Sequence, residues 1–253
     1  MNTLARSGPR IDPSDPSAAA VAGFSLIELM VCTVIIATIA SIAAPMLQSA
    51  EIATRERAVI STLRHIASAQ RQVRVAAVID SDTDGLGEYG FLQELAGTRM
   101  FRVDTDADGV ADATGTQTFS PPPLSSSFGE VDATGCLERG GYLYRVYLPA
   151  ADFDWTQEPG PGAVAVGVGA RAAASCWACY AWPVNYGQTG FRAFFVNQSG
   201  RVLVCSNQDT GYDGLVHDPD KRAVLLPGGA GKMNSPVAID IAGEDGNVWR
   251  VIE

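Results

Sequence analysis

Two short stretches, residues 80–88 and 104–112, place acidic side chains at alternate positions before a glycine. Their acidic residues are Asp80, Asp82, Asp84 and Glu88 in the first stretch, and Asp104, Asp106, Asp108 and Asp112 in the second. Calcium takes about six to eight oxygen ligands, and alternating carboxylates around a tight glycine turn deliver several of them to one point. The spacing therefore makes both stretches candidate calcium sites.

A solvated acidic turn is the alternative interpretation of both stretches, because Asp-Gly is a common turn pair. Neither stretch has the bidentate glutamate that closes a complete EF-hand loop at its twelfth position, where Phe91 and Gly115 stand instead. The first stretch also follows a predicted helix directly, so it could serve simply to end that helix. Calcium is the one cofactor that the sequence suggests.

Four of the five cysteines lie in the second half of the chain, at Cys136, Cys176, Cys179 and Cys205. In an oxidising compartment four thiols suit two disulfides with three possible pairings, and we favour this interpretation. A zinc site would need all four side chains as thiolates. Redox activity of the Cys176–Cys179 pair would need a helix start, whereas the aromatic residues around this pair predict a strand.

Nothing in the sequence indicates catalysis. The histidines, His65 and His217, are far apart, and no grouping of Ser, His and Asp or of Cys and His suggests a nucleophile with its base. A glycine-rich phosphate loop is also missing from the sequence. We therefore expect a protein that is not an enzyme. The net charge of −10 gives no attraction to nucleic acid, so we expect no nucleic-acid partner.

The elements that position these residues begin with an apolar segment. Residues 24–47 contain one charged side chain, Glu28. At about 1.5 Å rise per residue, a helix of this length crosses a hydrocarbon core of roughly 30 Å. The polar residues 1–23 do not form an ordinary secretory leader, because the small residue Gly23 comes before the apolar run. We therefore expect a transmembrane helix over residues 24–47.

Residues 23–31, with the sequence GFSLIELMV, resemble the processing site of type IV prepilins and type II secretion pseudopilins. The resemblance implies that a prepilin peptidase removes the leader, residues 1–23, on the cytoplasmic side. The same enzyme would methylate the new N-terminal residue, Phe24, and the helix would be retained. Pro45 also matches the family, which commonly has a proline about two-thirds of the way along this helix.

Glu28 is the residue to which the resemblance gives a physical role. A lone carboxylate in hydrocarbon costs several kcal/mol, so it needs a partner. In the family the partner is the free amine of a neighbouring subunit's first residue, here Phe24, and the pairing sets the register between helices. The alternative is a glutamate that reaches water at the membrane surface. Pro45 is expected to kink or locally melt the helix, because it removes one backbone hydrogen bond.

Residues 48–79 continue as an amphipathic stem. Apolar residues recur every seven positions at Ile52, Val59, Ile66 and Val73. No glycine or proline interrupts residues 46–84. One helix is therefore predicted over residues 24–79, with an apolar first half and a second half suited to lie on a sheet.

Residues 80–253 are predicted to form a head that contains an antiparallel sheet. The strand candidates are residues 141–148, 176–182, 191–196, 201–205 and 247–252. Residues 197–200 indicate a hairpin turn, and the stretch around them resembles the last hairpin of major pseudopilin heads. About four or five strands against the stem give an α+β fold of the pilin kind.

The resemblance implies a structural subunit of a type II secretion pseudopilus or a type IV pilus-like filament. Its partners would be copies of itself, other pilin-like subunits, the prepilin peptidase and the assembly platform of the inner membrane. It would be a single-pass inner-membrane protein with its head in the periplasm, and an extracytoplasmic filament after assembly. The alternative is a solitary membrane-tethered head that binds a ligand and uses the prepilin export route.

Overall fold

The computed structural model describes residues 23–252 of the chain. The expected leader therefore lies outside the described residues, apart from Gly23. The chain divides after Leu47 into two compact units, and one long helix, α1 (Leu26–Ala76), contributes residues to both.

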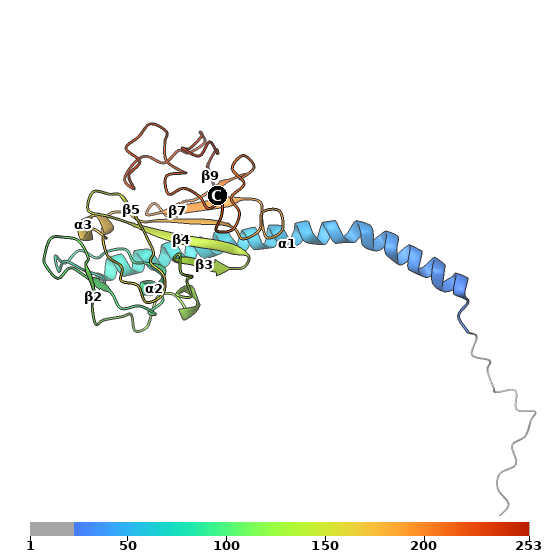
Figure 1. The fold of residues 1–253 in the computed structure, drawn as a ribbon, viewed down its shortest axis with the longest axis horizontal. Helices are drawn as coiled ribbons and strands as arrows, with labels where there is room; N and C mark the ends of the chain where they lie inside the picture. The colour runs from blue at the N-terminus through green and yellow to red at the C-terminus, as the bar shows by residue number, and fades with distance from the viewer. Residues whose placement is uncertain (1–22, 253) are drawn as a thin grey trace, which may run out of the picture. The chain divides into compact units, whose positions relative to one another are not determined.

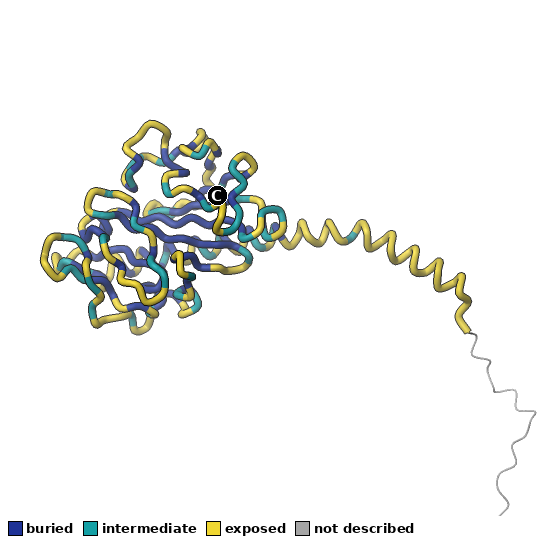
Figure 2. The backbone as a smooth tube through the Cα atoms, viewed as in Figure 1, coloured by how far each residue is buried: buried dark blue, intermediate teal, exposed yellow. Residues whose placement is uncertain are grey.

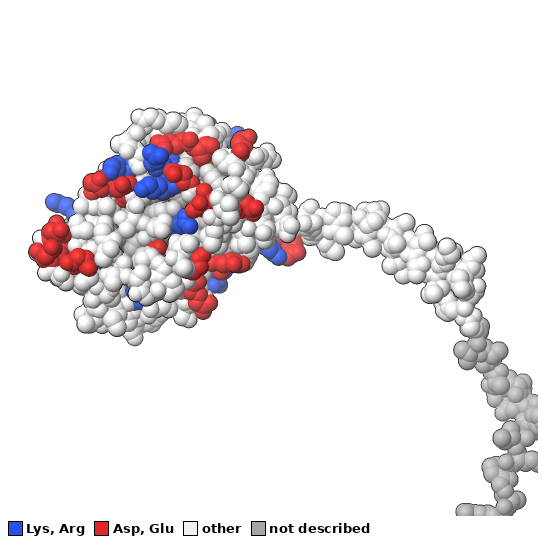
Figure 3. Space-filling model, viewed as in Figure 1, with Lys and Arg blue, Asp and Glu red and all other residues white. Residues whose placement is uncertain are grey.

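The first unit contains the part of α1 that ends at Leu47. From Gly23 to Leu47 every residue is exposed except the half-buried Ala43 (Figure 2). Its most apolar window has a mean hydropathy of 2.4 with none of the window buried, so the helix is long and apolar enough to cross a membrane. On the face seen in Figure 3 this surface carries no charged side chain. The helix continues through Pro45, so the expected local melting does not occur here.

The second unit, from Gln48 onward, holds the rest of α1 against a sheet. The residues that α1 buries are Ile52, Glu56, Val59, Leu63, Ile66, Ala67, Ala69, Gln70 and Val73. The seven-residue apolar spacing predicted this face, because residues seven apart lie on one side of a helix. The helix ends before the predicted limit at residue 79, since Ala77 adopts a left-handed φ of 47°.

A seven-stranded antiparallel sheet forms the centre of the second unit (Figure 1). Its strands are β3 (Cys136–Arg139), β4 (Tyr142–Pro149), β5 (Trp155–Gln157), β6 (Ala178–Pro183), β7 (Ala193–Asn197), β8 (Val202–Cys205) and β9 (Arg250–Val251). The order across the sheet is β3-β4-β6-β7-β8-β9, and β5 pairs with β4 beyond the end of β3. The register of β4 and β6 sets Val146 opposite Cys179.

The sheet is covered on both faces, and every residue of β4 and β6 is buried. On one face Val146 and Cys179 join Leu63 of α1 in a core that we call the stem core. On the other face Tyr180 and Trp249 belong to a second core, which we call the outer core. Burial on both faces explains why the strand sequences are almost continuously apolar instead of alternating.

Five short elements lie outside the main sheet, and the acidic stretches lie in loops next to some of them. They are α2 (Leu92–Leu95), β1 (Arg102–Val103), β2 (Ala113–Thr114), η1 (Ser126–Phe128) and α3 (Ala170–Ala173). β1 and β2 pair as a separate two-stranded sheet. The first acidic stretch lies between α1 and α2, and the second is the loop that joins β1 to β2.

The observed fold is α+β, with a long apolar N-terminal helix and an antiparallel sheet domain, as predicted. Each of the five predicted strand ranges overlaps an observed strand. The number of strands is a correction, because the sheet has seven strands and the prediction missed the short β3 and β5. The last predicted strand, 247–252, shrinks to Arg250–Val251.

Candidate functional site

The first acidic stretch forms a turn whose own carboxylates accept its backbone N–H groups. Asp80 accepts the N–H of Asp84 at 3.1 Å and that of Gly85 at 3.0 Å. Gly85 has a φ of 84°, which a residue with a side chain rarely adopts, and the chain curls tightly there. The curl brings one carboxylate oxygen each of Asp80, Asp82 and Glu88 within 4.8 Å of one another.

The second stretch repeats this geometry. Asp104 accepts the N–H of Ala107 at 2.8 Å and that of Gly109 at 2.7 Å. Gly109 has a φ of 83°, the counterpart of the first glycine. One carboxylate oxygen each of Asp104, Asp106 and Asp108 lies within 4.8 Å of the others. Similar spacing in the sequence therefore gives similar turns, but the carboxylates that group together stand at different positions, because the first group ends on Glu88 and the second on Asp108.

Two of the predicted ligands lie outside these groups. Asp84 accepts the N–H of Leu86 at 2.7 Å. Asp112 accepts both the N–H and the hydroxyl of Thr105, at 3.0 and 2.7 Å. These two carboxylates stabilise the turns themselves, so the structure groups six of the eight predicted residues and not the other two.

Mutual repulsion acts on the grouped carboxylates. Burial raises the pKa of Asp82, and the neighbouring carboxylates of its stretch raise it further. The N–H of Asp108 lowers the pKa of Asp106, but the charge of Asp108 and desolvation outweigh it and raise that pKa overall. Desolvation acts to raise the pKa of Asp104, but the N–H of Gly109 contributes to a net lowering. A bound cation would relieve the repulsion.

The donor set is one that a hard cation such as calcium prefers. Each group offers three carboxylates, and main-chain carbonyls and water commonly complete such a shell. A ligand at the twelfth position is not available in either stretch. Phe91 is fully buried in the stem core, and Gly115 has no side chain.

A buried arginine, which the sequence patterns did not single out, connects the two stretches. Arg102 donates to Glu88 and to Glu94, each at 2.6 Å, and all three side chains are at most 1% exposed. Glu88 also accepts the N–H and the hydroxyl of Ser81, both at 2.6 Å. The carbonyl of Ser81 in turn accepts the N–H of Asp104 at 3.0 Å. The two acidic turns therefore lie side by side.

A second buried carboxylate, Glu158, also gave no signal in the sequence. It directly follows β5 and accepts the N–H groups of Leu92 at 3.0 Å and Gln93 at 2.8 Å, at the start of α2. Burial raises the pKa of Glu158 to about 7, although the two N–H groups and the nearby Arg99 lower it. Glu158 therefore fastens α2 to the main sheet.

The four cysteines of the head do not meet. Cys136, Cys176 and Cys205 lie in the outer core, and Cys179 lies in the stem core. Cys136 on β3 and Cys205 on β8 are four strand positions apart, which is roughly 19 Å. A disulfide needs Cα atoms within about 7 Å. All four side chains are free thiols, so the expected disulfides are not formed.

The thiols do not form a zinc site either. Burial raises the pKa of Cys136 and Cys176, and it raises the pKa of Cys205 to about 12. Zinc binds thiolates, and among residues 23–252 no three cysteines converge as possible ligands. These side chains therefore act as small apolar residues in the two cores.

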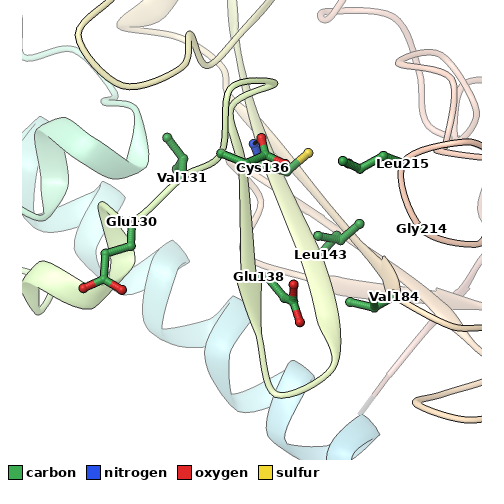
Figure 4. Close-up of a pocket in the computed structure, with 9 residues that line it drawn as sticks. Glu130, Val131, Cys136, Glu138, Leu143, Val184, Gly214 and Leu215 are labelled. Atoms are coloured by element: carbon green, nitrogen blue, oxygen red, sulfur yellow. Dashed lines mark hydrogen bonds between the residues drawn. The ribbon is translucent and has the colours of Figure 1, made fainter.

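A cavity of about 310 Å³ lies beside β3, at one edge of the sheet (Figure 4). Cys136 and Glu138 line it from β3, and Val184 and Leu215 line it from the loops that follow β6 and β8. Nε of Arg145 donates to Sγ of Cys136 at 3.1 Å. Because burial raises its pKa, Cys136 faces the cavity as a neutral thiol.

The residues predicted for processing and assembly all lie in the first unit. Gly23 and Phe24 precede α1, and the side chain of Phe24 is exposed. Glu28 stands in the first turn of α1, is exposed, and has no ion-pair partner among residues 23–252. In an apolar medium this carboxylate would need a cation from elsewhere.

The histidines have structural contacts only in the part of the chain that the structure describes. His65 packs edge-on against Phe128, with ring centroids 5.7 Å apart. His217 exchanges backbone hydrogen bonds with Asp213. Neither histidine joins a cluster of possible metal ligands there.

Fold and sites together define a class of protein: an α+β domain with paired acidic turns, attached to a helix able to cross a membrane. Over residues 43–215, more than half of the chain, the sequence matches the model of a family described as a protein of unknown function, DUF2950. The chain therefore belongs to the DUF2950 family. A search of curated proteins and a search of solved structures gave no match. The matched range contains both acidic stretches and begins after Glu28.

Proposed function

We propose that this protein is a membrane-anchored structural subunit of an extracytoplasmic filament, of the type IV pilus or type II secretion pseudopilus kind. The observation that carries the proposal is Glu28, a carboxylate in an exposed apolar helix that has no ion-pair partner among residues 23–252. It stands four residues after Phe24. Cleavage after Gly23 would create the missing cation, which is the amine of Phe24, on every copy.

Pairing between copies would give the filament its register. If the amine of one copy meets Glu28 of the next, the two helices are displaced by about four residues, or roughly 6 Å. Lipid would contact the apolar surface of residues 24–47 before assembly, and neighbouring helices would contact it afterwards. A costly charge in the single copy becomes a pair in the filament.

The second unit supports the same proposal. There the stem part of α1 lies on an antiparallel sheet, which is the arrangement that the resemblance to pilins implies. In this account the head is periplasmic and the helix is anchored in the inner membrane. The prepilin peptidase, the assembly platform and other pilin-like subunits are the partners. We propose no catalytic role.

We further propose that the two acidic turns bind calcium and that the ion stabilises the head. Six grouped carboxylates in two adjacent and similar turns support this. Asp80 and Asp82 in one turn, and Asp104, Asp106 and Asp108 in the other, would supply ligands. Glu88 is already paired with Arg102, so it would hold the first turn in place more than it would bind the ion.

The test is the intact mass of the chain extracted from its native membrane. The proposal predicts the mass of residues 24–253 with one added methyl group. The mass of the full chain from Met1 would contradict it. A solitary tethered head would be processed in the same way but would stay monomeric, so the presence of the chain in sheared filaments separates the two functions.

A further inference from the structure

One side of the stem carries arginines that meet no carboxylate. Arg57, Arg64 and Arg71, which we call the arginine row, follow one another at seven-residue spacing on α1, and all three are exposed. Residues seven apart are about 10.5 Å apart along a helix and lie on nearly the same side. Ser61 and Ser68 stand between them on the same side and are too small to cover them.

The arginine row stands on the side of α1 opposite its buried face, and the guanidinium of Arg71 lies next to Gly200 in the turn between β7 and β8. Two residues after each arginine come Val59, Ile66 and Val73, which are buried in the stem core. Two residues turn an α-helix by about 200°, so the arginines stand almost opposite these valines and the isoleucine. The row is therefore available to another molecule.

From Arg57 to the end of the stem the chain carries no acidic side chain. Residues 57–79 contain four arginines and no aspartate or glutamate. Among residues 23–252 the three arginines of the row make no ion pair, whereas Arg55, Arg102 and Arg192 each hold a glutamate. Three guanidinium groups without counter-charges are tolerated in water, because charges about 10 Å apart are screened there.

We propose that the arginine row is the docking surface for the acidic head of a second copy of this chain. This inference rests on the proposed function, in which staggered copies pack side by side. Charge complementarity selects the occupant: residues 79–253 carry eleven Lys and Arg against twenty-three Asp and Glu, which is −12. Acidic side chains form several separate groups on the face of the head shown in Figure 3, and Lys and Arg stand among some of them. Guanidinium groups bind carboxylates in a bidentate way, which adds geometry to the attraction.

The test compares charge reversal on the row with the same reversal elsewhere. The full, processed chain is reconstituted in phosphatidylcholine vesicles, with one of two fluorescent proteins at its C-terminus, and association is measured by energy transfer. The test variant is R57E/R64E/R71E. The matched control is R171E/R201E/R250E, because these three head arginines are also exposed and hold no ion pair among the described residues. R57K/R64K/R71K keeps the charge of the row.

We expect charge reversal on the row to weaken association about tenfold or more, and the control to stay within about threefold of the natural chain. The lysine variant should fall between them, because an ammonium group keeps the charge but cannot bind a carboxylate in the bidentate way. High salt should weaken the natural chain and leave the reversed row unaffected, because salt screens exposed ion pairs. Thermal melting of each variant checks that the head is still folded, which is expected because the changed residues are exposed.

Each other outcome has a definite meaning. If the reversed row associates as the natural chain does, the inference is overturned and the proposed function stands. If the natural chain does not associate at all, the proposed function is overturned, and the inference that rests on it is overturned as well. If the row matters only in vesicles that contain phosphatidylglycerol, the occupant is the phosphate of a lipid headgroup, and the inference is overturned.

Discussion

Glu88 is a carboxylate that the fold buries, and Glu28 is a carboxylate that the proposed membrane insertion would take out of water. Glu88, in the head, is 1% exposed and meets Arg102 at 2.6 Å. Glu28, in the apolar helix, has no cation within the described chain. A carboxylate in an apolar medium needs a counter-charge in both cases. The head supplies the counter-charge of Glu88 itself. In the proposed filament, Glu28 would obtain its counter-charge from another copy of the chain.

The largest effect is expected when the counter-charge of Glu88 inside the head, Arg102, is removed. Arg102→Met leaves Glu88 and Glu94 buried without a cation, and we expect a loss of about 3–5 kcal/mol in the free energy of unfolding. Chemical denaturation of the chain in detergent measures it. The control is E88Q/E94Q/R102M, which removes all three charges together and should recover much of the loss. Stability within about 1 kcal/mol of the natural chain for the single variant would contradict the account.

Glu158 sharpens the comparison, because it is a buried carboxylate with hydrogen-bond donors but no ion-pair partner among the described residues. Its pKa is raised from 4.5 to about 7 in the folded chain. The folded state therefore holds the proton more tightly than the unfolded state. The resulting stability is fully present below about pH 4.5 and is lost as the pH rises through about 7.

The size of this effect follows from the shift, and is on the order of 3 kcal/mol. Denaturation midpoints between pH 5 and 8 should fall for the natural chain, and Glu158→Gln should flatten the fall. The side chains that face Glu158 include Arg99 and Cys179, and neither is expected to change its charge in this range. An unchanged slope in the glutamine variant would show that another group is responsible.

The acidic turns are a third case, in which the proposed counter-charge is calcium from solution. Calcium at about 100 times its dissociation constant should stabilise the head by about 2–3 kcal/mol. A chelator should lower the melting temperature of the natural chain. D104N/D106N should reduce the response to the chelator, because only the first turn then keeps its ligands. The control, D209N/E130Q, changes two exposed acids that hold no ion pair in the described chain and should keep the response.

The smallest effect is expected for a charge pair that stays in water. Glu51 and Arg55 meet at 2.5 Å, but their side chains are 63% and 34% exposed. Arg55→Ala should cost no more than about 0.5 kcal/mol in the same denaturation measurement, because exposed pairs gain little over hydration. A loss comparable to that of Arg102→Met would erase the distinction between buried and exposed partners.

Helix, strands and acidic turns were predictable because their signals are local. The seven-residue repeat from Ile52 to Val73 matches the helical period, and the Asp-Gly spacing dictates a turn. The disulfide prediction was wrong, and the sequence held one sign against a bond between Cys176 and Cys179. Cys176 and Cys179 are three residues apart in an extended segment, and an odd spacing there sends side chains to opposite faces of a sheet.

Arg102 and Glu158 could not be found in this way, because their partners are distant in sequence. Glu158 meets the N–H of Leu92 across 66 residues, and no periodicity encodes such a contact. Arg102 and Glu88 are closer, but neither carries a local signal for burial. A charged residue in a sequence is expected to be exposed, and only the packed structure identifies the exceptions.

The most direct test of the central claim is the replacement of Glu28 by alanine in the chain produced in its native membrane, followed by cross-linking of whole cells. The account predicts that the variant is still cleaved after Gly23 and still inserted, but that it is recovered as single copies, because the amine of Phe24 no longer has a carboxylate to meet. Multimers of the variant in the same amount as those of the natural chain would contradict the account.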